Sequence, residues 1–166
     1  MQLCKMLSDK FPKAKFLFIS PHRHEVIEAA AATYGLDPKK IITRHANRHE
    51  VPVLLSFSSY SIFFIKPCYS KISSSPTKHG EIMAMGIPVI TNSGVGDVEE
   101  IVNKYHAGYV LPDFSEKSFN EVVNKIAAGN QFNSEEIRNG AKEYYSLSEA
   151  VNRYRYVYDF IFRNKV

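Results

Sequence analysis

Short, wholly apolar segments alternate with helical segments along the chain, and this alternation restricts the fold more than any other feature. The apolar segments, of which 16–19 and 62–65 are typical, have the length of a strand and show no polar face. A strand that is apolar at every position belongs in a parallel sheet with both faces covered by helices. We therefore predict an α/β fold with one Rossmann-like, mostly parallel sheet. The periodicities place strands at 15–19, 40–43, 61–65, 88–91 and 108–111, and helices at 3–11, 25–34, 50–57, 76–85, 97–105, 118–128, 134–145 and 148–162.

Length and composition fit one globular unit that spans residues 1–166, with closing helices over 134–162. The chain has 166 residues, 45% hydrophobic and 23% charged, which excludes a disordered chain or a disulfide-stapled miniprotein. No apolar run approaches the roughly 20 residues of a membrane helix, and the N-terminus lacks a signal core. Cys4 and Cys68 lie far apart, so we expect two free thiols and a cytoplasmic location. The net charge of +4 does not by itself favour nucleic acid.

The most informative connection follows the 61–65 segment and opens the helix at 76–85. Ser75 suits the N-cap and Pro76 the first helical position, which places Lys78 in the first turn. A lysine is unfavourable there because a helix N-terminus already carries partial positive charge. Free backbone N–H groups and a lysine together form an anion site, and a diphosphate would resolve the conflict. The alternative is that Lys78 extends into solvent.

Glu81 lies one turn further along the same expected helix. Thr77, Lys78 and Glu81 fall on one side of it, because residues three and four apart are neighbours on a helix. A carboxylate one turn from a phosphate site is well placed to accept hydrogen bonds from ribose hydroxyls. The simpler interpretation is a surface ion pair between Lys78 and Glu81.

A second connection, 92–97, joins the 88–91 strand to the next helix. Gly94 and Gly96 permit a close backbone approach or a positive φ. The pair lacks the third glycine of a dinucleotide-binding fingerprint, so a plain turn capped by Asp97 is the alternative.

The run Glu81-Ile82-Met83-Ala84-Met85-Gly86-Ile87-Pro88-Val89-Ile90 resembles the signature of nucleotide-diphospho-sugar glycosyltransferases of the GT-B fold, in the group called group 1 or family four. The Glu100-Ile101-Val102 and Ala107–Leu111 segments extend the likeness. The resemblance implies the C-terminal, donor-binding half of such an enzyme. It also implies a nucleotide-diphospho-sugar donor as substrate, with no further cofactor and no bound metal.

The resemblance also implies roles for particular residues. Glu81 matches the second glutamate of the family's Glu-x7-Glu motif, which contacts the donor ribose. Ser75, Thr77 and Lys78 fall in the region that faces the donor diphosphate, with Lys78 and Glu81 as the catalytic pair. Gly94 and Gly96 lie in the adjoining turn. Ser73 occupies the place of the family's first glutamate, and this departure leaves the choice of sugar open.

A second departure concerns the start of the chain. The family domain normally begins with a strand and a lysine-containing glycine segment, whereas this sequence opens in the following helix and lacks the acceptor-binding domain. The resemblance therefore predicts a fragment or one component of a split enzyme. We expect a gap in the sheet that is closed by rearrangement or by another molecule, as in a strand-swapped or gap-filling oligomer.

Other features favour ordinary structural roles. The His22/His24 and His45/His49 pairs lack the further ligands that would complete a metal site, and His79 is expected to contribute at most a minor phosphate contact. Basic and aromatic residues interleave over 153–158, but the apolar stripe there favours a helix packed on the domain. Two alternatives to a glycosyltransferase remain: a non-catalytic nucleotide- or phosphate-binding module, and a Rossmann-like epimerase or phosphate-binding domain.

Overall fold

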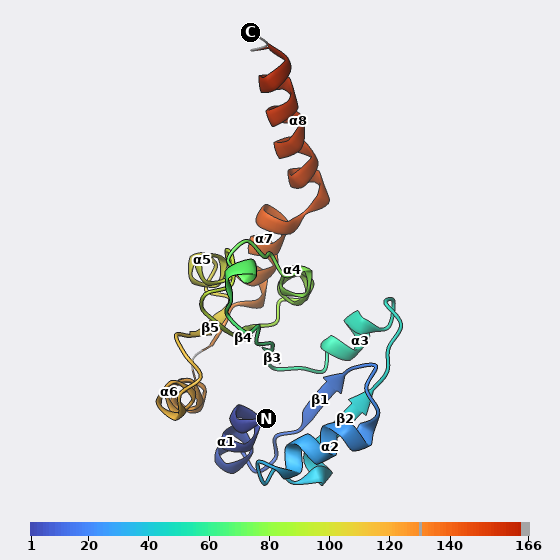
Figure 1. Ribbon diagram of the computed structural model, residues 1–166, viewed down its shortest axis with the longest axis vertical. Helices are drawn as coiled ribbons and strands as arrows, with labels where there is room; N and C mark the ends of the chain where they lie inside the picture. The colour runs from blue at the N-terminus through green and yellow to red at the C-terminus, as the bar shows by residue number, and fades with distance from the viewer. Residues whose placement is uncertain (130, 164–166) are drawn as a thin grey trace.

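The computed structural model describes residues 1–129 and 131–163, and strands alternate with helices from residue 2 to residue 127, after which two more helices follow (Figure 1). The alternation predicted from the sequence is confirmed element by element. The helices are α1 Gln2–Lys10, α2 His24–Ala32, α3 Val51–Leu55, α4 Thr77–Ala84, α5 Val98–Lys104, α6 Glu116–Ala127, α7 Ser134–Tyr145 and α8 Leu147–Arg163, with short 3₁₀ turns at Pro38–Lys40 and Tyr69–Lys71. The strands are β1 Phe16–Ile19, β2 Ile41–Arg44, β3 Ser61–Ile62, β4 Val89–Asn92 and β5 Gly108–Leu111.

The strands form two parallel sheets where the sequence predicted one. β1 pairs with β2, and β3, β4 and β5 pair in that order. All of these pairings are parallel, with Phe16 opposite Ile41 in the first sheet and Val89 opposite Gly108 in the second. Among the described residues β1 and β3 do not pair with each other, so the expected gap lies between these two edges.

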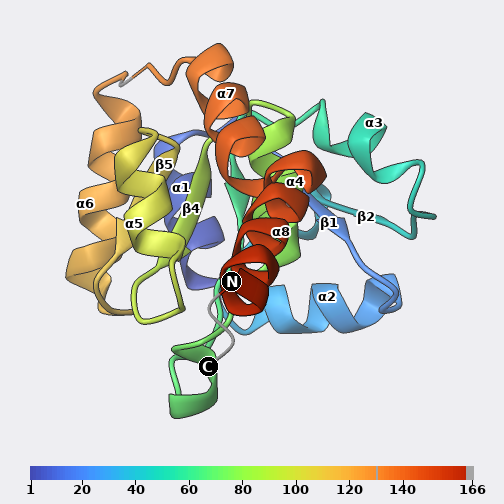
Figure 2. The ribbon, with the colours of Figure 1, turned by 90° about the horizontal axis from the view of Figure 1, so that it is seen from above.

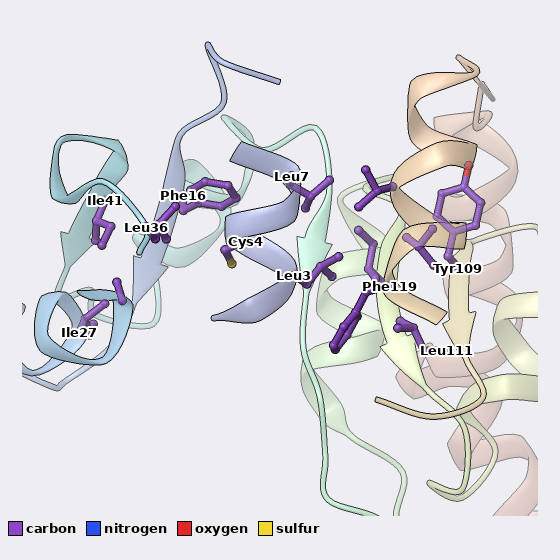
Figure 3. Packing of buried hydrophobic residues seen from close by; sticks show 14 residues of the cluster. Leu3, Cys4, Leu7, Phe16, Ile27, Leu36, Ile41, Tyr109, Leu111 and Phe119 are labelled. Carbon is purple, nitrogen blue, oxygen red and sulfur yellow. The ribbon is translucent and has the colours of Figure 1, made fainter. Parts of the chain in front are cut away.

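Helix α1 links the two sheets through a shared hydrophobic core. Leu3, Cys4 and Leu7 of α1 belong to one buried cluster that reaches Phe16 and Ile41 on the first sheet. The same cluster includes Ile90, Tyr109 and Leu111 on the second sheet and Phe119, Val122 and Val123 on α6. Figure 3 shows α1 between these two groups of side chains. The two sheets are thus held together by side-chain packing instead of by backbone hydrogen bonds.

Strand β3 is shorter than the predicted 61–65 segment, but hydrogen bonds to β4 continue beyond it. The Phe63 N–H donates to the carbonyl of Ile90 at 3.1 Å. One step on, the buried Asn92 side chain replaces backbone: its Oδ1 accepts from the Ile65 N–H and its Nδ2 donates to the Ile65 carbonyl, both at 2.9 Å. Asn92 thereby fixes the chain that leaves β3 toward α4.

Helix α8 forms where it was predicted, but the expected packing is wrong. None of its residues is buried, and Leu147, the first residue of the apolar stripe, is 79% exposed. Figure 1 shows α8 extending away from the rest of the chain beyond α7, and Figure 2, seen from above, looks along α8. The extended backbone of Ser146 turns α8 away, and α7 already covers the core with Ile137, Gly140 and Ala141. Within the described residues no helix is both long and apolar enough to cross a membrane.

Candidate functional site at the N-terminus of α4

The predicted site residues lie where two strand-to-helix connections meet. The loop after β3 leads to α4, and the turn after β4 leads to α5. The Gly96 N–H donates to the Lys71 carbonyl at 3.0 Å, and a Cβ built on Gly96 would lie 1.9 Å from the Ser74 carbonyl oxygen. With φ at +45°, Gly96 thus combines an unusual conformation with a contact that only glycine allows. The turn after β4 thus makes the predicted close backbone approach, and its partner is the loop that precedes α4.

The start of α4 differs by one position from the prediction. Pro76 is the N-cap and Thr77 the first helical residue, and no side chain caps the helix. The Ser75 hydroxyl, expected as the cap, instead donates to Oδ2 of Asp97 at 3.4 Å. Because the first N–H groups of a helix have no partners within it, the uncapped α4 presents backbone donors beside the exposed Lys78.

Lys78 and Glu81 are both exposed, and their charged groups lie near different residues. Lys78 Nζ lies 6.0 Å from the centre of the Phe63 ring. The Glu81 carboxylate is 54% exposed and lies 3.9 Å from the guanidinium of Arg48, which is itself 96% exposed. Such an exposed ion pair contributes little stability, so Glu81 is free to bind another group. The simpler interpretation of a Lys78–Glu81 ion pair is wrong, because the partner of Glu81 is Arg48.

An open groove of about 520 Å³ lies between α4 and α7 and contains part of the predicted site. Thr77 and Glu81 line its α4 side, and Arg138 and Lys142 line its α7 side. The two cations were not identified from the sequence, because their contribution depends on how α7 packs on α4. Gly80 permits that packing, since a Cβ there would lie 2.8 Å from the Tyr145 ring.

His79 is the predicted residue that the structure removes from the site. Its ring is fully buried between Phe63 and Tyr145, each with its ring centre at 5.7 Å. Nδ1 of His79 lies 3.0 Å from the Tyr145 hydroxyl. Burial lowers the pKa of His79 to about 4, although the negative charge of Asp97 opposes the shift. A buried, neutral imidazole cannot contact a phosphate at neutral pH, so the expected minor role is wrong and His79 is part of the core.

Asp97 connects the site to α7. It is the N-cap of α5 by position, as the plain-turn interpretation expected, but its carboxylate makes no capping bond. Oδ2 accepts a hydrogen bond from the Tyr144 hydroxyl at 2.8 Å as well as the bond from Ser75. This bond is the main cause that raises the pKa of Tyr144, and burial raises the pKa of Tyr145. Through these two hydrogen bonds, Asp97 links the loop before α4 to the end of α7.

The remaining predicted residues are accessible. Ser73, Ser75 and Thr77 are exposed, as is Gly94, whose φ of +75° favours glycine. His24, one of the candidate metal ligands, instead contacts Thr43 and Glu28. Among residues 1–129 and 131–163 no group of three metal-binding side chains comes together. Both cysteines are free thiols, as predicted, with Cys4 buried and Cys68 exposed.

Comparisons with known proteins identify the family and the fold of the chain. Residues 1–143 match the family model described as glycosyl transferases group 1. The solved structure of AviGT4, a glycosyltransferase involved in avilamycin A biosynthesis, superposes with a TM-score of 0.67 at 16% identity, covering 99% of this chain and 48% of that one. Sucrose-phosphate synthase from Thermosynechococcus elongatus superposes with a TM-score of 0.66 at 16% identity, covering 99% and 43%. A search of curated proteins gave no match.

The structural matches confirm the expected α/β, Rossmann-like fold of a GT-B half. At such low identity they support the fold alone. The chain spans less than half the length of either solved chain.

Proposed function

The chain belongs to the group 1 glycosyl transferases, and from this membership we propose that it forms the donor-binding part of an enzyme that transfers a sugar from a nucleotide-diphospho-sugar to an acceptor. The main observation behind this proposal is the uncapped N-terminus of α4, on which the exposed residues Lys78 and Glu81 lie one turn apart. The acceptor site, in this proposal, belongs to a second domain outside the described fold. The two free thiols favour a cytoplasmic setting, which is also part of the proposal.

The diphosphate of the donor binds at the start of α4. Backbone N–H groups of the first turn and the ammonium of Lys78 stabilise its negative charge. This charge increases as the glycosidic bond to the diphosphate breaks, so the same groups stabilise the transition state more than the ground state. The hydroxyls of Ser75 and Thr77 supply further contacts to the phosphate oxygens. Gly94 leaves the adjoining turn without a side chain, and Gly96 lets that turn approach the Ser74 carbonyl closely enough to hold the loop before α4 in place.

The ribose of the donor binds to Glu81. Its exposed carboxylate makes the weak contact with Arg48, so it can accept hydrogen bonds from two ribose hydroxyls. Fixing the ribose one turn from the diphosphate orients the anomeric carbon for attack. Ser73 leaves the sugar end of the site without a carboxylate.

Calorimetric titration of UDP, GDP and their sugars tests this proposal. We expect saturable binding that is weakened about tenfold or more by Glu81→Ala. Lys78→Ala should weaken UDP more than uridine, because only UDP carries the diphosphate. Lys117→Ala and Glu121→Ala are matched controls, since both residues are exposed on α6, whose N-terminus is already capped by Ser115.

A sugar-transfer assay separates the alternative of a non-catalytic module, which Ser73 in place of a glutamate favours. Such a module binds the nucleotide, but it transfers no sugar when the acceptor-binding half is added. No binding by the folded wild-type chain, or equal loss in the α6 controls, would refute the site.

A further inference from the structure

We propose that Tyr144 of α7 is a positioning residue for the donor diphosphate: its hydroxyl holds the Asp97 carboxylate toward α7 and so leaves the Ser75 hydroxyl free to donate to a phosphate oxygen. The inference rests on the proposed donor site, because it concerns the affinity of that site for a diphosphate. Tyr144 touches no substrate in this arrangement. It acts through Asp97, whose negative charge lies close to the place proposed for the diphosphate.

The Asp97 carboxylate lies beside the start of α4. Its Oδ2 atom is 3.4 Å from the Ser75 hydroxyl, and Ser75 is two residues before the first residue of α4. Next to this contact, the bond from the Gly96 N–H to the Lys71 carbonyl keeps the two loops together. A carboxylate repels a phosphate and competes with it for the same donor. Asp97 is therefore unfavourable for a diphosphate here unless its carboxylate is turned away.

One short hydrogen bond holds this carboxylate. The Tyr144 hydroxyl donates to Oδ2 at 2.8 Å, a normal length for such a bond, whereas the bond from Ser75 is long at 3.4 Å. The other oxygen, Oδ1, is buried and has no hydrogen-bond partner within the described residues. The contact with Tyr144 is therefore the main restraint on the direction of the Asp97 side chain.

The helix that follows Asp97 offers its carboxylate no ready replacement. Asp97 occupies the N-cap position of α5, but with φ at −91° and ψ at 2° it lacks the extended conformation typical of a capping residue, and it makes no capping bond. Without the Tyr144 hydroxyl, the donor already beside Oδ2 is Ser75. Asp97 would then bind Ser75 more closely and bring its charge toward the diphosphate.

Tyr144 is suited to this role by its place and its chemistry. Figures 1 and 2 show α7 beside α4, and the hydroxyl near the end of α7 reaches the turn before α5. The bond to Asp97 is the main cause that raises the pKa of Tyr144, so the hydroxyl stays protonated and can donate at neutral pH. The Tyr144 ring packs against the Tyr145 ring at 5.1 Å, a contact that phenylalanine would keep.

Calorimetric titration of UDP and of uridine into the wild type and Tyr144→Phe tests this role. Tyr144→Phe should bind UDP about tenfold more weakly, because a negative charge approaches the diphosphate and the Ser75 hydroxyl is taken. Uridine carries no phosphate and should bind the two proteins alike. If the wild type binds GDP instead of UDP, GDP and guanosine replace UDP and uridine.

Asp97→Asn separates this positioning role from a structural one. Asparagine has the shape of aspartate without its charge, so this variant should bind UDP at least as tightly as the wild type. In the Asp97→Asn background, Tyr144→Phe should change the affinity for UDP by less than about twofold. A structural role of Tyr144 would weaken UDP binding to the same extent in both backgrounds. Tyr154→Phe is the control variant, since Tyr154 lies on α8 and is 69% exposed.

The outcomes distinguish this role from the donor site itself. Equal UDP affinity of Tyr144→Phe and the wild type would overturn the role of Tyr144 and leave the donor site intact. An equal loss in both backgrounds, or an equal loss for UDP and uridine, would also overturn it, because either result would assign Tyr144 to the fold. A folded wild-type chain that binds neither UDP nor GDP would refute the donor site, and this role with it.

Discussion

Replacing His79 with glutamine should remove a pH-dependent part of the stability. The buried imidazole has its pKa lowered to about 4 from an ordinary value of 6.5. Between these values the unfolded chain binds a proton that the folded chain does not, so the free energy of unfolding falls as the pH falls from 6.5 to 4. The two pKa values differ by about 2.5, and at 1.36 kcal/mol for each step of one in pKa this difference corresponds to roughly 3 kcal/mol of folding stability, all of it present above pH 6.5.

The assay is urea unfolding followed by far-ultraviolet circular dichroism at several pH values, since the chain has no tryptophan. His79→Gln keeps a polar group beside the Tyr145 hydroxyl but loses the ring packed between Phe63 and Tyr145. We expect the variant to be less stable than the wild type at pH 7. Its deficit should shrink by roughly 3 kcal/mol by pH 4, because the wild type alone then loses the contribution of the imidazole.

Comparing the two proteins at each pH removes the contribution that carboxylates titrating in the same range make to the free energy of unfolding, because both proteins share it. His22→Gln is the matched control, since His22 is exposed in a loop and this variant keeps His79. Parallel stability curves for His79→Gln and the wild type would refute the reasoning, because His79 would then carry the same charge in the folded and unfolded states.

Two further predictions concern the loop at the site and the C-terminal helix. Gly96→Ala should destabilise the fold by about 2–4 kcal/mol, because the new Cβ would meet the Ser74 carbonyl and φ is +45°. Gly94→Ala should destabilise it less, because its Cβ would lie 3.4 Å from Pro67. Equal midpoints of urea unfolding for the two variants would contradict this prediction. Deleting residues 147–166 should change the free energy of unfolding by about 1 kcal/mol or less, because α8 buries no side chain. Its Arg153, which is exposed, stacks on Tyr144 at 5.3 Å and donates a long hydrogen bond of 3.4 Å to the Glu143 carbonyl. A calorimetric melting shift of many degrees on truncation would show that α8 contributes to the core.

The fold could be predicted from the sequence wherever one segment determines its own structure. The segments predicted as strands at 15–19 and 88–91 are strands, and the helix predicted at 76–85 is followed by Gly86 with a φ of +72°. The proposed anion site at Lys78 was inferred in the same local way, from the charge of a helix start. Such features depend on a few neighbouring residues, so their signals survive in the sequence.

The errors arose where packing between distant segments decides the outcome. His79 and Lys78 are adjacent on α4, and nothing in their spacing says that one turns inward to Tyr145, 66 residues away. Ser75 has the chemistry of a cap, yet Asp97 competes for its hydroxyl once the two loops meet. The stripe on α8 has the period of a packed helix, but a period does not indicate whether a partner surface is present.

The proposed donor site rests on the second sheet and its helices, so it depends little on the order of the first sheet. α4 and the turn before α5 are held by β3, β4 and α7, through the buried cluster of Met83, Ile101 and Ile137 and through the bonds of Asp97. The first sheet is joined to this part mainly through α1. Arg48, which contacts Glu81, lies in the loop after β2 of the first sheet, but this exposed contact is weak. We therefore expect α4 to keep its geometry when the packing of the first sheet is disturbed. Loss of nucleotide binding in Ile41→Ala, which removes a buried side chain from the first sheet, would contradict this separation, because it would show that the order of that sheet reaches Glu81.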